Sequence, residues 1–301
     1  RKHMKKQTLF SPFDGLSLSV AISEPQGAPI GIIQFSHGMA EHKERYFPFM
    51  EYLSENGYIC VIHDHRGHGG SVKSDKDYGY FYTEDIWAIV EDLHEVSVVI
   101  KEQYPYLPLY LFSHSMGTLV ARNYLKKYDI LISKLVLCGP PTENKAVSLG
   151  LFLAKHSGKR KDKVPNHFLN NLAFKSFYKG YAEPNAWLSE NPDNVTIYNN
   201  DPLCGFIFTT NGFINLLTLQ KEAFNADNWH PRNPKLPILV MAGEDDPVII
   251  SERKFQELLF FLKKVGYSNL QSKLYKNNRH ELLNESNHEE IFEDILKFFD
   301  A

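Results

Sequence analysis

The chain has 301 residues and a formal net charge of −3 at neutral pH, which is long enough for one large α/β domain or for a domain with an insertion. The weakly acidic balance gives no overall positive field for nucleic acid. No apolar run is long enough to span a bilayer, and the N-terminus lacks the apolar core of a signal peptide. We therefore expect a cytoplasmic protein without nucleic-acid partners.

The three cysteines, Cys60, Cys138 and Cys204, are too few and too scattered for a disulfide framework or a zinc site. Cys60 and Cys138 lie inside apolar runs, so we expect buried thiols there. Residues 1–3 precede Met4, and we expect them to be a remnant of an expression tag.

Strands and helices are expected to alternate along much of the chain. Alternating apolar residues predict a half-exposed strand at residues 16–22. Mostly apolar runs, typical of strands buried on both faces of a parallel sheet, predict further strands at residues 31–35, 58–62, 109–112, 134–138 and 238–242. Another strand is expected near residues 270–275. Helical spacing predicts helices at residues 46–56, 84–103, 116–128, 251–265 and 288–299. The alternation predicts an α/β fold with a mostly parallel central sheet covered by helices.

The alternation stops between residues 140 and 229, where aromatic side chains are dense. We expect residues 1–139 and 230–301 to form the α/β core, and residues 140–229 to form an inserted, mainly helical cap. Phe152 and Phe177 are expected to bind substrate by lining an acyl-chain pocket. Alternatively, the aromatics form only the core of the cap itself, as most of them must.

A group of basic residues adjoins an apolar run of the cap. It consists of Lys155, Lys159, Arg160, Lys161 and Lys163. A solvated loop is the interpretation that we favour for these side chains. The alternative is a transient contact with anionic headgroups at a membrane surface, which would make the protein peripheral to the membrane.

The pentapeptide Ser113-His114-Ser115-Met116-Gly117 lies between the strand at 109–112 and the following helix. A serine in such a turn exposes its hydroxyl, and the helix N-terminus and nearby backbone N–H groups can stabilise an oxyanion. The pattern is that of the nucleophile elbow, G-x-S-x-G, with Ser113 in place of the first glycine. Because that position must be small, we expect an intact but slightly strained elbow. A serine present by chance in an ordinary turn is the alternative.

A serine hydroxyl needs a base to remove its proton, and the base needs an acid to orient it. Asp245 and Asp246 follow a buried strand, and His280 follows the last strand. Adjacent side chains on an extended segment point apart, so only one of the two acids can face the histidine. We favour Asp246, with Asp245 as the alternative.

His288 is the rival of His280 as the base. Ser286 and Glu289 form a capping-box pattern, which predicts that His288 lies in the exposed first turn of a helix. His280 is therefore the better candidate.

A tetrahedral intermediate also needs backbone donors for its oxyanion. Met116, the residue after the nucleophile, is expected to supply one N–H group. Met39, in the loop after the strand at 31–35, is expected to supply the second. Gly38 allows the backbone of this loop to approach the substrate closely.

The histidine-rich stretch at residues 63–68 suggests metal ligands, because His63, Asp64, His65 and His68 could all bind an ion. Arg66 in the middle of the stretch would repel a cation. We therefore expect a structural loop and no metal.

Five ordered motifs together resemble the monoacylglycerol lipase and lysophospholipase family, which is often grouped with the serine aminopeptidase-like α/β-hydrolases. They are His37-Gly38-Met39-Ala40-Glu41-His42 with Arg45-Tyr46, Asp64-His65-Arg66-Gly67-His68-Gly69 with Ser71, His114-Ser115-Met116-Gly117, Asp246-Pro247-Val248 and Arg279-His280-Glu281. The resemblance covers essentially the whole chain and implies the α/β-hydrolase fold.

The same resemblance implies a catalytic triad of Ser115, Asp246 and His280, with Met39 and Met116 as oxyanion donors. It supports Asp246 over its neighbour because the acid of the family directly precedes Pro-Val. It also implies that the histidine-rich loop is structural.

We expect a serine hydrolase that cleaves a small-molecule ester of a monoacyl lipid, such as a monoacylglycerol, through an acyl-enzyme and without a cofactor. The alternatives within enzymes are a lysophospholipase, a general carboxylesterase, and an acyl-amide or aminopeptidase-type hydrolase, since esters and amides use the same triad. A silent α/β-hydrolase that only binds a ligand is the non-enzyme alternative, and it would be expected to lack one triad member.

Overall fold

A computed structural model describes residues 4–158 and 162–301. The expected tag remnant at residues 1–3 and the three central basic residues of the cap, 159–161, lie outside the described residues.

The described strands form one sheet in the order β1-β2-β4-β3-β5-β6-β7-β8. Their bounds are β1 Lys5–Phe10, β2 Ser17–Ser23, β3 Gly31–Ser36, β4 Tyr58–His63, β5 Leu109–His114, β6 Lys134–Cys138, β7 Ile238–Gly243 and β8 Leu270–Tyr275. β1 pairs with β2 and β2 with β4 in antiparallel fashion, and the other pairs are parallel. The predicted mostly parallel sheet is confirmed.

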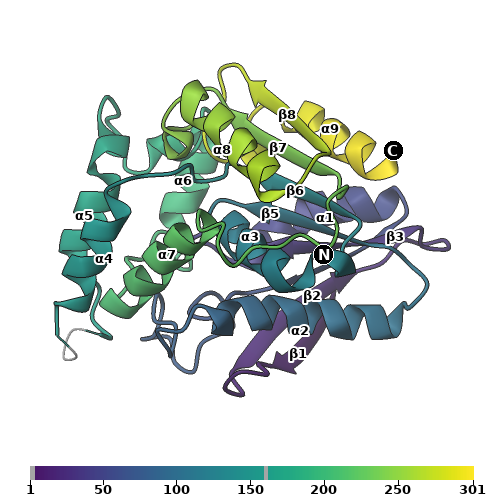
Figure 1. Cartoon of the computed structure of the whole chain (residues 1–301), viewed down its shortest axis with the longest axis horizontal. Coiled ribbons are helices and arrows are strands. Elements are labelled where there is room, and N and C mark those ends of the chain that lie inside the picture. Colours follow the sequence, from purple (N-terminus) through teal and green to yellow (C-terminus); the bar gives the residue numbers. More distant parts are fainter. Residues whose placement is uncertain (1–3, 159–161) are drawn as a thin grey trace.

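Helices connect the parallel strands and cover both faces of the sheet (Figure 1). Their bounds are α1 Phe47–Glu55, α2 Trp87–Gln103, α3 Met116–Tyr128, α4 Val147–Lys155, α5 His167–Phe174, α6 Pro192–Asn200, α7 Thr210–Ala223, α8 Glu252–Val265 and α9 His288–Asp300. Side chains of α1 and α9 pack on one face of the sheet, and those of α2, α3 and α8 pack on the other.

Alternation along the buried strands divides the core between these two layers. In β3, Ile32 joins the cluster under α2 and α3, whereas Ile33 and Phe35 join the cluster under α1 and α9. Successive side chains of a strand point to opposite faces, so an unbroken apolar run serves both layers.

The edge strand β1 was not predicted from the sequence. Its residues Lys5 and Lys6 are polar, and its burial pattern is largely exposed because β2 covers only one of its edges. An edge strand can therefore lack the apolar signal that identifies the inner strands.

The segment between β6 and β7 holds α4 to α7 and contains no strand among its described residues. Figure 1 shows α4 and α5 projecting beside the sheet, while α7 lies between them and the core. The cap boundaries stay a prediction. Within the described residues, no helix is both long enough and apolar enough to cross a membrane.

Candidate active site

Ser115 occupies a strained turn between β5 and α3. Its backbone has φ 54° and ψ −121°, a conformation that costs free energy for any residue other than glycine. The Ser115 N–H donates to the carbonyl oxygen of Cys138 over 3.0 Å, and the Thr118 hydroxyl donates to the Ser115 carbonyl over 2.7 Å. A Cβ at Gly117 would collide with the carbonyl oxygen of Ser36, so only glycine fits at this crossing of strand and helix. Neighbouring elements thus hold the turn in place.

Ser113, the departure from the usual elbow pattern, is fully buried. Its hydroxyl donates to the carbonyl oxygen of Val136 on the adjacent β6 over 2.7 Å. The hydroxyl is therefore paired within the sheet, and the left-handed backbone lies at Ser115, two residues further on.

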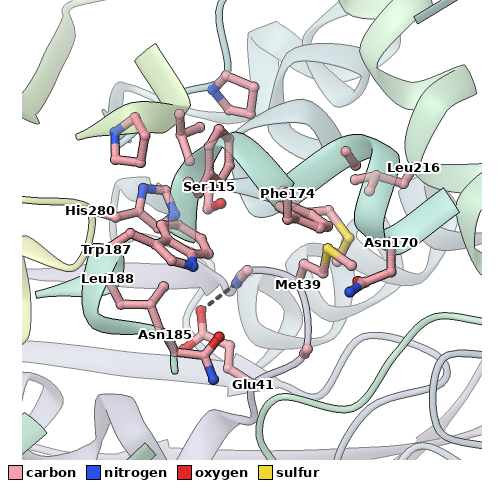
Figure 2. Close-up of a pocket in the computed structure, with 18 of the residues that line it drawn as sticks. Met39, Glu41, Ser115, Asn170, Phe174, Asn185, Trp187, Leu188, Leu216 and His280 are labelled. Carbon is pink, nitrogen blue, oxygen red and sulfur yellow. Dashed lines mark hydrogen bonds between the residues drawn. The ribbon is translucent and has the colours of Figure 1, made fainter. Parts of the chain in front are cut away.

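His280 and Asp246 meet at the carboxyl ends of β7 and β8. His280 Nδ1 donates to Asp246 Oδ2 over 2.8 Å, while Asp246 Oδ1 accepts from the N–H of Val248. The bond at Nδ1 leaves Nε2 free to face the serine, and Figure 2 shows the imidazole beside Ser115. Asp245 is exposed, so the structure places Asp246 and not its neighbour against the histidine.

The pKa of His280 is raised above its usual value. Burial lowers this pKa, but the negative charge and the hydrogen bond of Asp246 outweigh burial, with smaller contributions from Glu281 and Glu41. The neighbouring His114 ring lies 4.7 Å from that of His280, and burial with the charge of His280 lowers its pKa to about 4. A positive charge on the His280 imidazole is therefore stabilised by the adjacent Asp246 carboxylate.

His288 begins α9, as predicted, and is half-buried. The predicted capping box is wrong, because the N-cap is Asn287 and it makes no side-chain capping bond. His288 Nδ1 instead lies 3.0 Å from the carbonyl oxygen of Glu285. His288 is not among the residues that line the cavity at Ser115.

The expected oxyanion donors both border Ser115. Met39 and Met116 line the cavity, and neither backbone N–H is bonded to another described residue. The N–H groups on either side of Met39 are already engaged, that of Gly38 by Glu41 and that of Ala40 by His68. The two methionine N–H groups thus remain available for a developing negative charge.

Gly38 also borders the nucleophile. A Cβ at this position would lie 3.1 Å from the Cβ of Ser115 and 2.8 Å from Glu41 Oε2. Glycine therefore leaves room for a substrate carbonyl between the loop and the serine.

A buried ion-pair chain supports the loop at residues 38–41. Glu41 Oε2 accepts from the Gly38 N–H over 2.7 Å and from the Tyr46 hydroxyl. Arg45 Nη1 donates to Glu41 and to Glu281, over 2.8 and 2.7 Å. Burial raises the pKa of both carboxyl groups, but the charge of Arg45 outweighs it and holds them below their usual values. These ion pairs connect the loop at residues 38–41 to Glu281, the residue that follows His280.

A cavity of about 710 Å³ opens over Ser115 (Figure 2). The cavity is lined by Gly38, Met39, Met116, Phe177 and His280, together with residues that were not singled out from the sequence. These further residues include Asn170, Phe174, Asn185, Trp187, Leu188 and Leu216. The sequence shows that residues 140–229 are rich in aromatics, but it does not show which of these side chains face the cavity.

Phe152 does not line the cavity, contrary to the expectation from the sequence. Its side chain is 56% exposed, and its ring packs against that of His156 at an angle of 33°. In α4 the buried residues are Gly150, Leu151 and Ala154, so Phe152 lies on the outer face of the helix. Since α4 is apolar on nearly every side, its pattern could not identify the inward face.

The loop after β4 is held by the ion pairs of buried charges. Asp64 accepts from Lys43 Nζ and from the Gly70 N–H, both over 2.9 Å. Arg66 pairs with Asp14 and Asp92, each over 2.8 Å. These contacts are those of a structural loop, and the absence of a metal there stays a prediction.

Among the described residues, one group of potential metal ligands lies close together. His42, Asp201 and Cys204 have ligand atoms within 4.8 Å of one another. His42 Nε2 and Asp201 Oδ2 lie 2.6 Å apart and form a hydrogen bond between the loop after β3 and the end of α6. This direct hydrogen bond explains, without a bound ion, why the His42 and Asp201 side chains lie close together.

A mostly parallel sheet with a serine at a strained strand-to-helix turn, and with a histidine and an acid on later loops, defines the α/β-hydrolase class. The sequence profile described as serine aminopeptidase, S33 matches residues 27–287. The chain therefore belongs to the serine aminopeptidase (S33) family of α/β-hydrolases.

Individual relatives agree with this assignment. The monoglyceride lipase of Rattus norvegicus is 31% identical over 196 residues, which are 63% of this chain and 57% of the rat protein. The monoacylglycerol lipase of Mycolicibacterium smegmatis is 24% identical over 298 residues, 96% of this chain and 95% of that protein. A carboxyl esterase from Bacillus coagulans has a solved structure with a TM-score of 0.88 and 26% identity, covering 99% of this chain and 98% of the esterase. The alignment with the rat lipase spans less than two thirds of that protein, and the family assignment rests on the profile match over residues 27–287.

Proposed function

We propose that the protein cleaves carboxylic esters of monoacyl lipids, with a monoacylglycerol as the representative substrate. The observation that carries the proposal is the cavity of about 710 Å³ over Ser115, a size typical of small-ligand pockets. Apolar side chains such as Met39, Phe174 and Leu216 border it on one side of the serine (Figure 2). The names of the rat and mycobacterial relatives support the same substrate class.

In the proposed reaction, His280 Nε2 takes the proton of Ser115 as its Oγ attacks the ester carbonyl. The N–H groups of Met39 and Met116 stabilise the oxyanion, and Asp246 stabilises the imidazolium through Nδ1. His280 then gives the proton to the leaving alcohol. Water attacks the acyl-enzyme by the same route and releases the fatty acid.

A transient contact of the cap with a lipid surface is part of this proposal. Phe152 and Phe168 are 56% and 65% exposed on the outer faces of α4 and α5, and Leu172 is exposed while also lining the cavity. Lys155 and Lys163, the described members of the basic group, are exposed next to them. Exposed apolar side chains with nearby lysines are suited to anionic headgroups around the cavity mouth.

A series of glyceryl esters from acetyl to decanoyl tests the substrate class. Burial of each methylene contributes about 0.8 kcal/mol, so kcat/KM should rise about fourfold per methylene until the cavity is filled. Leu216→Ala, in the cavity wall, should reduce the increase in kcat/KM with each added methylene. Phe152→Ala, on the outer face of α4, is the matched control and should preserve it. Equal rates for acetyl and decanoyl esters, or faster cleavage of an aminoacyl amide, would contradict the proposal and favour the aminopeptidase alternative.

A further inference from the structure

The two proposed oxyanion donors are held in different ways. The Met116 N–H belongs to the first residue of α3, so the helix fixes its direction. The Met39 N–H lies in a turn between β3 and the 3-10 helix Lys43–Tyr46. An N–H group stabilises an oxyanion best when its direction is fixed before the reaction. The turn therefore needs other contacts that hold Met39.

His37 holds the peptide group that carries the Met39 N–H. Its Nδ1 donates to the carbonyl oxygen of Gly38 over 2.8 Å, and its Nε2 accepts from the His65 N–H over 2.9 Å. The second bond requires a bare Nε2, which places the proton on Nδ1. The Gly38 carbonyl and the Met39 N–H belong to one trans peptide group and point in opposite directions. The bond to the carbonyl therefore turns the N–H away from the His37 ring.

His68 holds the other side of Met39. Its Nε2 accepts from the Ala40 N–H over 3.1 Å, and its Nδ1 donates to the carbonyl oxygen of Arg66 over 3.0 Å. Ala40 has a φ of 55°, which is unfavourable for a residue with a Cβ and persists only where the surrounding structure fixes it. The Ala40 carbonyl oxygen also accepts from the Gly205 N–H over 2.9 Å. Histidine side chains thus fix the peptide groups on both sides of Met39.

Both histidines lie behind the cavity and do not border it. Each is fully buried, and neither is among the described residues that line the cavity. Burial lowers the pKa of His37 to about 4 and that of His68 to about 3. Both rings are therefore neutral near pH 7, and each has one donating and one accepting nitrogen. His37 uses its donating nitrogen on the loop, whereas His68 uses its accepting nitrogen.

We infer that His37 and His68 are positioning residues for the reaction, because together they aim the Met39 N–H at the oxyanion. His37 acts by donating from Nδ1 to the Gly38 carbonyl, and His68 acts by accepting the Ala40 N–H at Nε2. The inference gives one member of the histidine-rich stretch at residues 63–68 a part in the reaction. It rests on the proposed ester hydrolysis at Ser115.

Amide side chains test the two histidines separately. The amide of asparagine lies near the position of a histidine Nδ1, and that of glutamine lies near the position of Nε2, so each replaces one ring nitrogen. His37→Asn keeps a donor for the Gly38 carbonyl, whereas His37→Gln does not. The kcat of His37→Asn should therefore exceed that of His37→Gln by about threefold to tenfold, the range for one neutral hydrogen bond.

The order should reverse at the other histidine. His68→Gln keeps an acceptor for the Ala40 N–H, whereas His68→Asn does not. The kcat of His68→Gln should therefore exceed that of His68→Asn by a similar factor. A purely structural role would depend on side-chain size and would give the same order at both positions.

The kinetic readout is hydrolysis of glyceryl decanoate. An N–H group that acts only on the oxyanion changes kcat and kcat/KM by the same factor, so KM should stay the same in all four variants. A decyl trifluoromethyl ketone, which forms a tetrahedral adduct with a serine, should lose affinity in the same order as kcat. Decyl glyceryl ether, which cannot form this adduct, should bind all four variants equally.

His63→Asn and His63→Gln are the matched controls. His63 is buried, and neither of its ring nitrogens has a partner among the described residues, so these two variants should have equal kcat. The same order of kcat for asparagine and glutamine at positions 37 and 68, or equal kcat within both pairs, would overturn the inference. A wild type that does not cleave glyceryl decanoate would contradict the proposed function itself.

A measurement on the wild type depends neither on the folding of a variant nor on turnover. Nitrogen-15 chemical shifts distinguish the protonated from the bare nitrogen of an imidazole. At pH 7, His37 and His68 should both carry their proton on Nδ1 and have a bare Nε2. A proton on Nε2 of either ring would rule out its bond to a backbone N–H and would overturn the inference for that histidine.

Discussion

The 2.8 Å contact between His280 Nδ1 and Asp246 Oδ2 fixes the orientation of the imidazole. Its neighbour Asp245 is exposed, although the two carboxylates are adjacent in the sequence. The residues alone did not decide which of the two acids faces the histidine. Adjacent side chains on an extended segment point apart, but this does not show which one points inward. The resemblance to a family motif favoured Asp246, and the structure places it against the histidine.

Asp246→Asn should lower kcat on the order of 10⁴-fold, because the amide cannot hold the imidazole in the required tautomer. Asp245→Asn, which makes the same chemical change on an exposed side chain, should change kcat little. Steady-state kinetics of both variants on one ester decides between them. A large loss of kcat in Asp245→Asn with a small loss in Asp246→Asn would show that Asp245, and not Asp246, orients the imidazole.

Single side chains of the cavity were harder to predict than the positions of Ser115, Asp246 and His280. Phe177 lines the cavity and Phe152 does not. Ser115 and Asp246 follow the buried strands β5 and β7, which the sequence locates well, whereas the inward face of the apolar helix α4 depends on packing that sequence periodicity does not resolve. Trp187 was one aromatic among many until the structure placed it on His280.

At the scale of elements, the loop after β4 and the helix α3 each contain a fully buried arginine. Arg66 donates to Asp14 and Asp92. Arg122 donates only to the carbonyl oxygen of Pro141, and its Nε and Nη2 have no partner among the described residues. Burial lowers the pKa of Arg122 to about 9. Arg66 is therefore paired with carboxylates in the core, whereas Arg122 has no carboxylate partner among the described residues and lies over the Phe224 ring, 4.7 Å from its centroid.

Replacing each arginine by methionine should have different effects. Arg66→Met should cost about 3–5 kcal/mol of unfolding free energy, because it leaves the buried Asp92 uncompensated. Arg122→Met removes a desolvated charge without stranding a carboxylate, so it should be close to neutral or stabilising. Urea unfolding at pH 7 measures both changes. A larger loss in Arg122→Met than in Arg66→Met would contradict this account of the two sites.

The inner strands were predictable because each is a short apolar run between turn residues. The edge strand β1 was missed because its exposed lysines carry no such pattern. The capping box predicted for α9 failed because Asn287 occupies the cap position without bonding to the helix. Local cap motifs thus depend on backbone geometry that the sequence does not specify.

At the scale of the whole molecule, four buried histidines surround the loop at residues 38–41. Burial lowers the pKa of His37 to about 4, those of His63 and His68 to about 3, and that of His65 well below its usual value. The unfolded chain binds protons at these positions below about pH 6.5, whereas the folded chain does not. The protein should therefore lose stability as the pH falls from about 6.5 toward 4.

His63→Leu isolates one part of this dependence, because neither ring nitrogen of His63 has a partner among the described residues. The variant should reduce the loss of unfolding free energy between pH 6.5 and 4 by about 3 kcal/mol, at about 1.4 kcal/mol per pKa unit. Denaturant unfolding across this range measures the loss. His230→Leu, at an exposed histidine, is the control for the substitution. An unchanged pH dependence of the unfolding free energy in His63→Leu would show that protonation of other groups destabilises the protein in acid.

The central claim is that Ser115 carries the acyl group, and active-site labelling tests it most directly. A fluorophosphonate probe followed by peptide mapping should place the label on Ser115, since its hydroxyl faces the cavity beside His280 (Figure 2). Ser115→Ala should abolish both labelling and ester turnover. Ser113→Ala is the matched control, because the Ser113 hydroxyl is buried against β6, and it should still be labelled. Label on Ser113, or turnover that survives in Ser115→Ala, would contradict the account.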